Sequence, residues 1–174
     1  MTGIQIREAR PSDQKAIKAV TLSAYQEYAT LMSDHWEVYR QNILTTLADI
    51  QPAAQLVADQ DGQLVGTALL YPAGTVMAAP GSVPVTRTWP EVRLLAVAPT
   101  ARGQGIGVAL MQECIRRARQ SGVRVLTLHT TDIMQSAMRL YARLGFQRAP
   151  DLDFQPAPDV TIKGYRLSLE EAAS

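Results

Sequence analysis

The sequence predicts an α/β fold: a central mixed, mostly antiparallel twisted sheet of about six or seven strands, flanked by about four helices. The first half of the chain contains a β-hairpin pattern. Strand and helix patterns alternate only in the second half, which favours a mixed sheet over a wholly parallel one. The chain has 174 residues, of which 47% are hydrophobic, enough to bury a core. We therefore expect a single domain over residues 1–174.

The spacing of apolar residues places the elements of the first half. Asp61-Gly62 favours a tight turn between two strand-like runs, which is typical of a β-hairpin. Pro11-Ser12-Asp13 supplies turn and N-cap residues for a helix. The expected elements are a strand at Ile4–Arg7, a helix from Asp13 to about Tyr28, a helix over about Asp34–Ile50, and hairpin strands at Gln55–Ala58 and Leu64–Leu70.

In the second half, strands and helices lie between two proline-rich segments, Pro72–Pro90 and Pro150–Pro158. We predict both as loops, and long loops inside a domain are often functional. Gly145 is expected to end the last helix. The other expected elements are strands at Glu91–Val97, Val123–His129 and Lys163–Ser168, a short strand opening at Phe146, and helices over about Gly105–Gln120 and Met134–Leu144.

Charge and cysteine content exclude several classes of protein. There are 17 basic and 16 acidic residues, so nothing favours binding to nucleic acid or to a membrane surface. Cys114 is the single cysteine, and no cluster of His, Cys and carboxylates has metal spacing, so we expect neither a disulfide nor a metal. Met1–Arg10 lacks the apolar run of a signal peptide, and no stretch is long enough to span a membrane. We expect a cytoplasmic protein.

The most informative stretch is the loop that follows the strand at Glu91–Val97 and leads into a helix. From Val97 it reads V-A-P-T-A-R-G-Q-G-I-G. The first turn of a helix has unpaired N–H groups and a positive dipole end, which together bind anions. Gly103, Gly105 and Gly107 have no Cβ, so a phosphate can approach their backbone. Several bonds of roughly 1.5–3 kcal/mol each would give micromolar binding of a diphosphate.

Two common phosphate-binding motifs do not fit this loop. A P-loop would need Gly-Lys-Ser or Gly-Lys-Thr, and neither follows here. A dinucleotide fingerprint needs two residues between its second and third glycines, whereas Gly105 and Gly107 enclose one. That fingerprint also belongs near the start of a parallel βαβ unit, and this loop lies late in the chain.

Arg102, Gly105 and Gly107 match the coenzyme A motif Gln/Arg-x-x-Gly-x-Gly/Ala, so the stretch resembles that of the GNAT superfamily of N-acetyltransferases. The resemblance implies a GNAT-like fold whose sheet splays between the strands at Glu91–Val97 and Val123–His129 to admit acetyl-CoA as cosubstrate. It also implies that strand backbone groups hold the pantetheine arm and that loop amides hold the pyrophosphate. The residues so implied are Leu95, Ala96, Val97, Arg102, Gly103, Gln104, Gly105, Ile106, Gly107 and Val108. The alternative is a glycine-rich connection without a ligand.

A second stretch, Ala137–Phe146, is similar to the family motif in which a helical tyrosine precedes a Gly-Phe pair. The resemblance places Tyr141 as general acid near the coenzyme A sulfur. A phenol, with a pKa of about 10, is protonated at neutral pH and can donate to a thiolate. The alternative is that Tyr141 only packs against the coenzyme or the core.

Glu91 begins the strand that leads to the expected pantetheine site, where some family members have a glutamate as general base, acting directly or through water. A lysine-like amine of pKa about 10.4 loses its proton at a cost of roughly 4.6 kcal/mol at pH 7, whereas an α-amine costs about 1 kcal/mol. A base therefore matters more for lysine-like acceptors. The alternative for Glu91 is an exposed carboxylate at a strand end.

One position departs from the family pattern. Many members have asparagine seven residues before the tyrosine, where it bonds the pantetheine or a water, and here that residue is Met134. Ser136, with Gln135 beside it, is the nearby polar residue that could partly compensate. We expect weaker coenzyme binding, with the pyrophosphate site unchanged.

Other reactive or charged residues have plainer interpretations. Cys114 lies on the apolar side of its helix and is expected in the core. His35 and His129 are expected to be structural, although His129 could border the acceptor cleft. The basic run Arg116, Arg117, Arg119 and Arg124 is typical of a solvated face, with contact to the adenosine 3′-phosphate as the alternative.

The resemblance implies acetyl transfer from acetyl-CoA to a primary amine of a small molecule or of a protein or peptide, by direct attack in a ternary complex. The rivals are a non-catalytic acyl-CoA sensor, transfer of a longer acyl group, and transfer to an oxygen. The acceptor should be bound near Tyr25–Trp36, Pro72–Pro90 and Pro150–Pro158. A homodimer is possible by analogy with the family alone.

Overall fold

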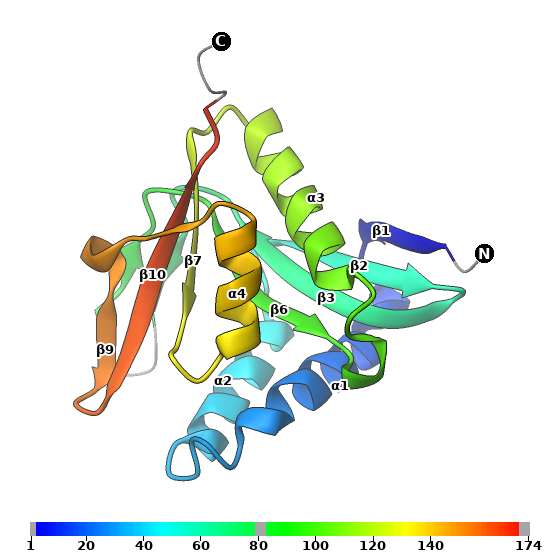
Figure 1. Ribbon diagram of the computed structural model, residues 1–174, viewed down its shortest axis with the longest axis horizontal. Helices are drawn as coiled ribbons and strands as arrows, with labels where there is room; N and C mark the ends of the chain where they lie inside the picture. The colour runs from blue at the N-terminus through cyan, green and yellow to red at the C-terminus, as the bar shows by residue number, and fades with distance from the viewer. Residues whose placement is uncertain (1–2, 79–82, 171–174) are drawn as a thin grey trace. The chain divides into compact units, whose positions relative to one another are not determined.

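The computed structural model describes residues 3–78 and 83–170. The chain divides into two compact units, Met1–Leu69 with Leu94–Glu113 and Leu70–Arg93 with Cys114–Ser174. The strands are β1 Ile4–Glu8, β2 Ala54–Gln60, β3 Gln63–Tyr71, β4 Val76–Met77, β5 Val85–Thr86, β6 Glu91–Val97, β7 Val125–Thr130, β8 Gln147–Arg148, β9 Phe154–Ala157 and β10 Val160–Ser168 (Figure 1). The helices are α1 Gln14–Tyr25, α2 Trp36–Ala48, α3 Ile106–Gln120 and α4 Gln135–Arg143, with 3-10 turns η1 Pro11–Asp13, η2 Gln26–Tyr28, η3 Pro99–Ala101 and η4 Pro150–Leu152.

In the first unit the sheet order is β1-β2-β3-β6. β1 pairs with β2 antiparallel, from Ile4 opposite Gln60 to Glu8 opposite Leu56. The β2–β3 turn has Asp61 at φ 53° and Gly62 at φ 85°, so both residues are left-handed, as the expected hairpin turn requires. Gly66 in β3 faces Ile106 and Leu110 of α3; a Cβ on Gly66 would lie 2.8 Å from the Ile106 side chain. The missing side chain therefore lets α3 pack closely on the sheet.

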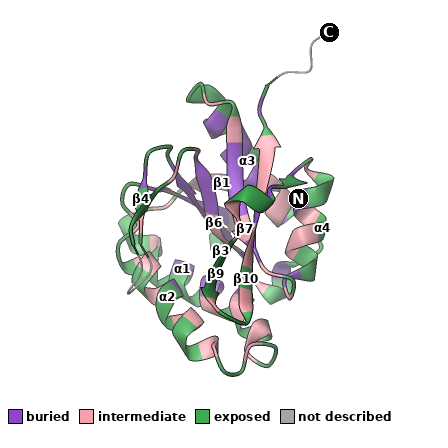
Figure 2. Ribbon diagram, turned by 90° about the vertical axis from the view of Figure 1, so that its left-hand side faces the viewer, coloured by how far each residue is buried: buried purple, intermediate pink, exposed green. Residues whose placement is uncertain are grey.

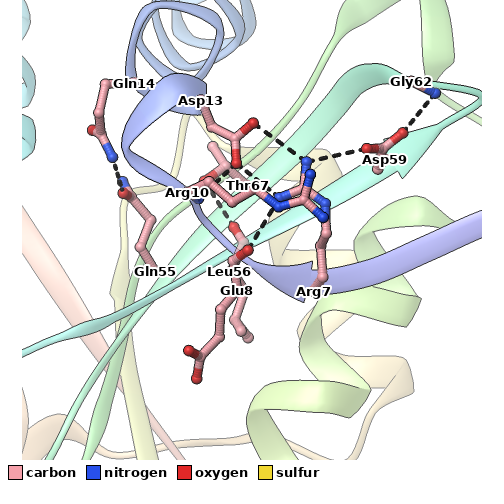
Figure 3. Close-up of polar contacts among 10 residues, drawn as sticks. All are labelled: Arg7, Glu8, Arg10, Asp13, Gln14, Gln55, Leu56, Asp59, Gly62 and Thr67. Atoms are coloured by element: carbon pink, nitrogen blue, oxygen red, sulfur yellow. Dashed lines mark hydrogen bonds and ion pairs between the residues drawn. The ribbon is translucent and has the colours of Figure 1, made fainter.

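A half-buried ion cluster joins β1, η1 and the β2–β3 hairpin (Figure 3). Arg7 Nη1 donates to Asp13 Oδ2 at 2.7 Å and Nη2 to Asp59 Oδ2 at 3.1 Å. Asp59 also accepts the Gly62 amide at 2.8 Å, which fixes the hairpin turn. The hydrogen bond from Arg7, the Arg10 amide and the nearby positive charge together lower the pKa of Asp13. The cluster sets how the first helix leaves the first strand.

In the second unit the sheet order is β6-β7-β10-β8, and β9 pairs with β10 beside it. β7 and β10 run side by side and antiparallel, with His129 opposite Gly164 (Figure 1). β6 pairs with β7 in parallel through Glu91 opposite Thr127 and Val92 opposite Leu128. Figure 2 shows the buried positions gathered on the strands, with exposed residues along α2 and α4. The α/β fold with a mostly antiparallel sheet and four α-helices is thus confirmed.

The structure corrects the predicted loops. Pro72–Pro90 contains the paired strands β4 and β5, with Val76 opposite Thr86; its residues 79–82 lie outside the described residues. Pro150–Pro158 contains η4 and the strand β9. The first helix also ends at Tyr25 and continues as the 3-10 turn η2, so the predicted end at Tyr28 marks the turn and not the helix.

None of the helices in the described part of the chain combines the length and hydropathy of a membrane span. Over the same described residues, no group of three or more His, Cys, Asp or Glu side chains is placed to hold a metal ion.

Candidate active site

The phosphate-binding loop predicted from the sequence lies in the first unit, between the end of β6 and the start of α3. Gly103 and Gly105 both have φ 77°, a left-handed conformation that glycine adopts without a steric cost. The Gly105 carbonyl accepts the Ala109 amide at 3.0 Å, so Gly105 is the N-cap of α3, and the amides of the first turn have no partner within the helix. A Cβ built on either glycine meets nothing within 4 Å. The space beside both glycines is therefore open.

The side chains of this loop point to protein partners, which leaves its backbone for a ligand. Arg102 Nη1 bonds Glu27 Oε2 at 2.5 Å, and Nη2 bonds the Ala24 carbonyl at 3.2 Å. Gln104 Oε1 accepts from Gln60 Nε2 at 3.1 Å. The Arg102 guanidinium thus joins the loop to the end of α1 and to η2. Any contribution of Arg102 to anion binding through its amide is independent of these bonds.

β6 has an irregular backbone just before the predicted pantetheine residues. Leu94 has φ 49°, a left-handed conformation that costs a non-glycine residue about 1–3 kcal/mol. The Leu95 carbonyl accepts the Tyr25 hydroxyl at 3.0 Å, and the Ala98 amide bonds the Val65 carbonyl at 2.8 Å. Ala96 is buried, whereas Leu95 and Val97 are half-buried. Because Leu94 is left-handed, the N–H and C=O groups of Leu95–Val97 point in directions that differ from those in a regular strand.

Glu91, the predicted base, lies in the second unit and is not an exposed carboxylate, because its side chain is only 2% exposed. Oε1 bonds His129 Nδ1, and Oε2 lies 3.9 Å from Arg87 Nε. Burial opposes ionisation of Glu91, but the bond to His129 and the positive charges of His129, Arg87 and Arg93 outweigh it and lower the pKa of Glu91. The carboxylate is therefore charged at neutral pH. Its strand-end position was predictable, but its ion pair was not.

Tyr141, the predicted acid, lies on α4 in the second unit and is 7% exposed. Its ring packs edge-on against Phe146, with the ring centroids 5.9 Å apart. Met134 directly precedes α4 and is 6% exposed, so its apolar side chain is buried where the family commonly has asparagine. Ser136 is exposed on α4 and lines a surface hollow. The other residues that line this hollow are Arg139, Ala142 and Arg143.

Sequence reasoning missed several residues around Glu91. His129 was expected to be structural, with the border of the acceptor cleft as the alternative, but its partners were not foreseen: its ring bonds Glu91 through Nδ1 and the Leu152 carbonyl through Nε2. Arg87 and Phe154 come from the two predicted loops and meet, with the guanidinium carbon 5.8 Å from the ring centroid. The available signal was that Glu91 and His129 both lie on strands predicted to be neighbours. Cys114 is buried, as predicted.

The pattern of the acetyltransferase (GNAT) family matches residues 21–146. A mycothiol acetyltransferase of Sanguibacter keddieii is 30% identical over 151 residues, which are 84% of this chain and 44% of that protein. The chain spans between 44% and 61% of the length of the first curated relatives it matches.

Solved structures of low identity share the fold. A GNAT-family acetyltransferase of Staphylococcus aureus superposes with a TM-score of 0.71 at 18% identity, over 97% of this chain and 100% of that one. A GNAT-family acetyltransferase of Brucella melitensis, solved in complex with acetyl-CoA, has a TM-score of 0.60 at 23% identity, over 100% and 93% of the two chains. The family match covers well over half of the sequence and includes the glycine loop, β6 and α4. This chain belongs to the GNAT family of acetyltransferases.

Proposed function

We propose that this chain is an acetyl-CoA-dependent N-acetyltransferase that acetylates a primary amine of a small molecule or of a protein or peptide. One observation carries the proposal: the left-handed glycines Gly103 and Gly105 lead into the first turn of α3, after the strand β6 and the turn η3. This arrangement presents unpaired amides to an anion in a loop that has the coenzyme A motif. The mycothiol acetyltransferase relative acts, by its name, on a small molecule, which supports this class of acceptor.

The coenzyme residues are those predicted from the sequence. Backbone groups of Leu95, Ala96 and Val97 would hold the pantetheine arm, and the bend at Leu94 supports this role. The amides of the loop and first turn would hold the pyrophosphate; they belong to Arg102, Gly103, Gln104, Gly105, Ile106, Gly107 and Val108. Ser136 on α4 would contribute a hydroxyl. Buried Met134 supplies no hydrogen bond in place of asparagine, so this part of the coenzyme would be held less tightly.

In the proposed reaction the amine nitrogen attacks the thioester carbonyl and forms the new C–N bond. The C–S bond breaks, the sulfur takes up a proton, and the amine nitrogen loses one. Holding the two substrates together supplies a large part of the rate enhancement, and proton transfer supplies the rest. Tyr141 is the proposed donor to sulfur. To serve as base, Glu91 would have to accept the proton on Oε2, directly or through water, or act through the His129 ring, because Oε1 is bonded to that ring and the side chain is buried.

Calorimetry with acetyl-CoA tests the binding site. Gly105→Glu adds a negative charge and a side chain where the pyrophosphate would sit, and loss of even one charge-assisted bond is worth about 10-fold or more in Kd. We expect Kd to rise at least about 30-fold. The matched control is Gly62→Glu, because Gly62 is also left-handed and its Cβ would also meet nothing within 4 Å. Equal Kd values for Gly105→Glu and the control would contradict the proposal.

Turnover is tested by free-thiol detection with acetyl-CoA and a panel of amines: phenethylamine, spermidine, and peptides offering a free α-amine or a lysine. Thiol release that depends on one of these amines is the expected result. A chain that binds acetyl-CoA and releases no thiol with any amine would instead be the acyl-CoA sensor. The homodimer and the cytoplasmic location stay predictions.

A further inference from the structure

The buried pair formed by Glu91 and His129 has a hydrogen-bonding pattern that fixes its protons. Nδ1 of His129 faces the Glu91 carboxylate, and Nε2 lies 2.9 Å from the Leu152 carbonyl, which can only accept. Nε2 must therefore carry a hydrogen, and one further proton lies between Nδ1 and Glu91. In this arrangement both ring nitrogens and Glu91 Oε1 are engaged. The other carboxylate oxygen, Oε2, lies 3.9 Å from Arg87 Nε in a side chain that is only 2% exposed. We call Glu91, His129 and the Leu152 carbonyl the His129 clasp.

The His129 clasp holds η4 close to β10, and this close approach is possible because residue 164 is a glycine. Gly164 on β10 lies opposite His129 on β7, and a Cβ on Gly164 would be 2.4 Å from Leu152 Cβ. The absent side chain lets Leu152 approach the sheet closely enough for its carbonyl to reach the imidazole. The Ala149 amide donates to the Gly164 carbonyl at 2.9 Å, so the residue before η4 is also hydrogen-bonded to Gly164.

A second set of bonds holds the other side of this segment. Asp153 Oδ1 accepts the Gly164 amide at 2.8 Å, and both carboxylate oxygens of Asp153 bond Arg148, each at 2.8 Å. The bond from Arg148, the Gly164 amide and the nearby positive charge lower the pKa of Asp153 to about 2. Leu152 and Asp153 are thus anchored separately, and Phe154 follows them directly.

Phe154 directly follows the two anchored residues, and its side chain is exposed. Its ring is 42% exposed, although one edge packs on His129 at 5.4 Å between centroids and its face lies near Arg87. Arg87 belongs to the segment Pro72–Pro90 and Phe154 to Pro150–Pro158, the two segments that the sequence predicts to bind the acceptor. An exposed aromatic ring held by a buried ion pair is a rigid apolar contact for a substrate.

We propose that Glu91 is a positioning residue, which acts through His129 and Leu152 to hold Phe154 as an apolar contact of the acceptor-binding surface. This inference rests on the proposed function. It replaces the general-base role of Glu91 with one that affects acceptor binding and leaves the chemical step nearly unchanged. It also favours an acceptor amine with an apolar or aromatic neighbour over a polycation, because Arg87 adds a positive charge beside the ring.

Glu91→Gln separates the two roles. A carboxamide N–H can donate to Nδ1 of a neutral His129 whose Nε2–H still bonds Leu152, so the clasp survives without a base. We expect kcat and the acceptor KM of Glu91→Gln to stay within about 3-fold of the original, measured with whichever panel amine gives the highest rate. Glu91→Ala and Asp153→Asn should raise the acceptor KM at least about 5-fold with kcat changed less than about 3-fold. A general base would instead show a 10-fold or larger fall in kcat for Glu91→Gln, and that result would overturn the inference.

Amide hydrogen exchange of residues 149–157 gives a readout that needs no turnover. Glu91→Ala and Asp153→Asn should accelerate exchange in this segment, whereas Glu91→Gln should not. The control is Glu170→Gln, which removes an exposed carboxylate paired with Arg124 at 3.6 Å, and it should change neither exchange nor KM. Unchanged exchange in Glu91→Ala would refute the clasp. If acetyl-CoA binds but no panel amine releases thiol, the proposed function fails while exchange still decides the clasp.

Discussion

At the residue scale, the Glu91–His129 ion pair makes a prediction about stability. Removing one partner of a buried pair leaves an uncompensated charge, so His129→Ala should lower the free energy of unfolding by about 3 kcal/mol at pH 7. The lowered pKa of Glu91 means that its contribution is present above the ordinary glutamate pKa and is lost as the pH falls through the folded value. The loss caused by His129→Ala should therefore be smaller at pH 4 than at pH 7.

Urea denaturation of the original chain, His129→Ala, Glu91→Ala and the double variant measures this coupling. The double variant should be more stable than His129→Ala, because it removes the buried charge together with its partner. If the losses in unfolding free energy of the two single variants add up to that of the double variant, and are the same at both pH values, the two side chains contribute to stability only through packing.

The Glu91–His129 pair also shows which features of a single residue can be predicted from the sequence. Glu91 stands at the start of a strand whose bounds were predicted correctly, and the glycine loop was located by its motif. Whether a strand-end glutamate is exposed or paired depends on the residue beside it in the neighbouring strand. His129 lies 38 positions away in the sequence, and no local sequence pattern indicates that it is the partner of Glu91. The roles of Tyr141 and of the loop amides stay predictions.

At the element scale, the approach of η4 to β10 depends on Gly164. A Cβ there would lie 2.4 Å from Leu152 Cβ and 3.0 Å from the Ala149 carbonyl oxygen, so η4 must move to admit it. Gly164→Ala should lower the free energy of unfolding by about 2 kcal/mol, as other overpacking changes do. Gly3→Ala is the control, since its Cβ would meet nothing within 4 Å and should leave stability nearly unchanged. A stable Gly164→Ala with unaltered exchange at residues 149–157 would show that η4 is held without this close approach.

Elements with a strong local signal were predicted well. The hairpin was marked by Asp61-Gly62, and β6 by its apolar residues at Val92 and 94–97, closed by Pro99. The strands β4, β5 and β9 were missed because each is two to four residues long and is defined by its partner. β9 pairs with β10 through an irregular register at Val160 and Ile162, which no alternation of apolar residues signals. Proline in these segments favoured loops, and short strands tolerate it at their edges.

At the scale of the whole molecule, the family followed from two motifs because both are local. The glycine loop and the Tyr-Gly-Phe stretch each combine a backbone requirement with a neighbouring helix, so a single sequence carries them. The proposed acceptor surface is different, because its side chains come from segments that meet only in the folded chain, as Arg87 and Phe154 do. A phosphate-binding loop could therefore be proposed from the sequence alone, whereas the contact between Arg87 and Phe154 required the structure.

The single domain predicted from the sequence can be tested because each compact unit contains one tryptophan, Trp36 in the first and Trp89 in the second. β3, β6 and α3 each contribute residues to both units, so neither unit can unfold without disrupting elements of the other. In each of the variants Trp36→Phe and Trp89→Phe, we expect the fluorescence of the remaining tryptophan to give the same urea midpoint as circular dichroism of that variant. Far-ultraviolet dichroism corrects for any stability change caused by the substitution itself. Midpoints that differ between fluorescence and dichroism within one variant would show that the two units unfold separately, and the chain would then contain two domains.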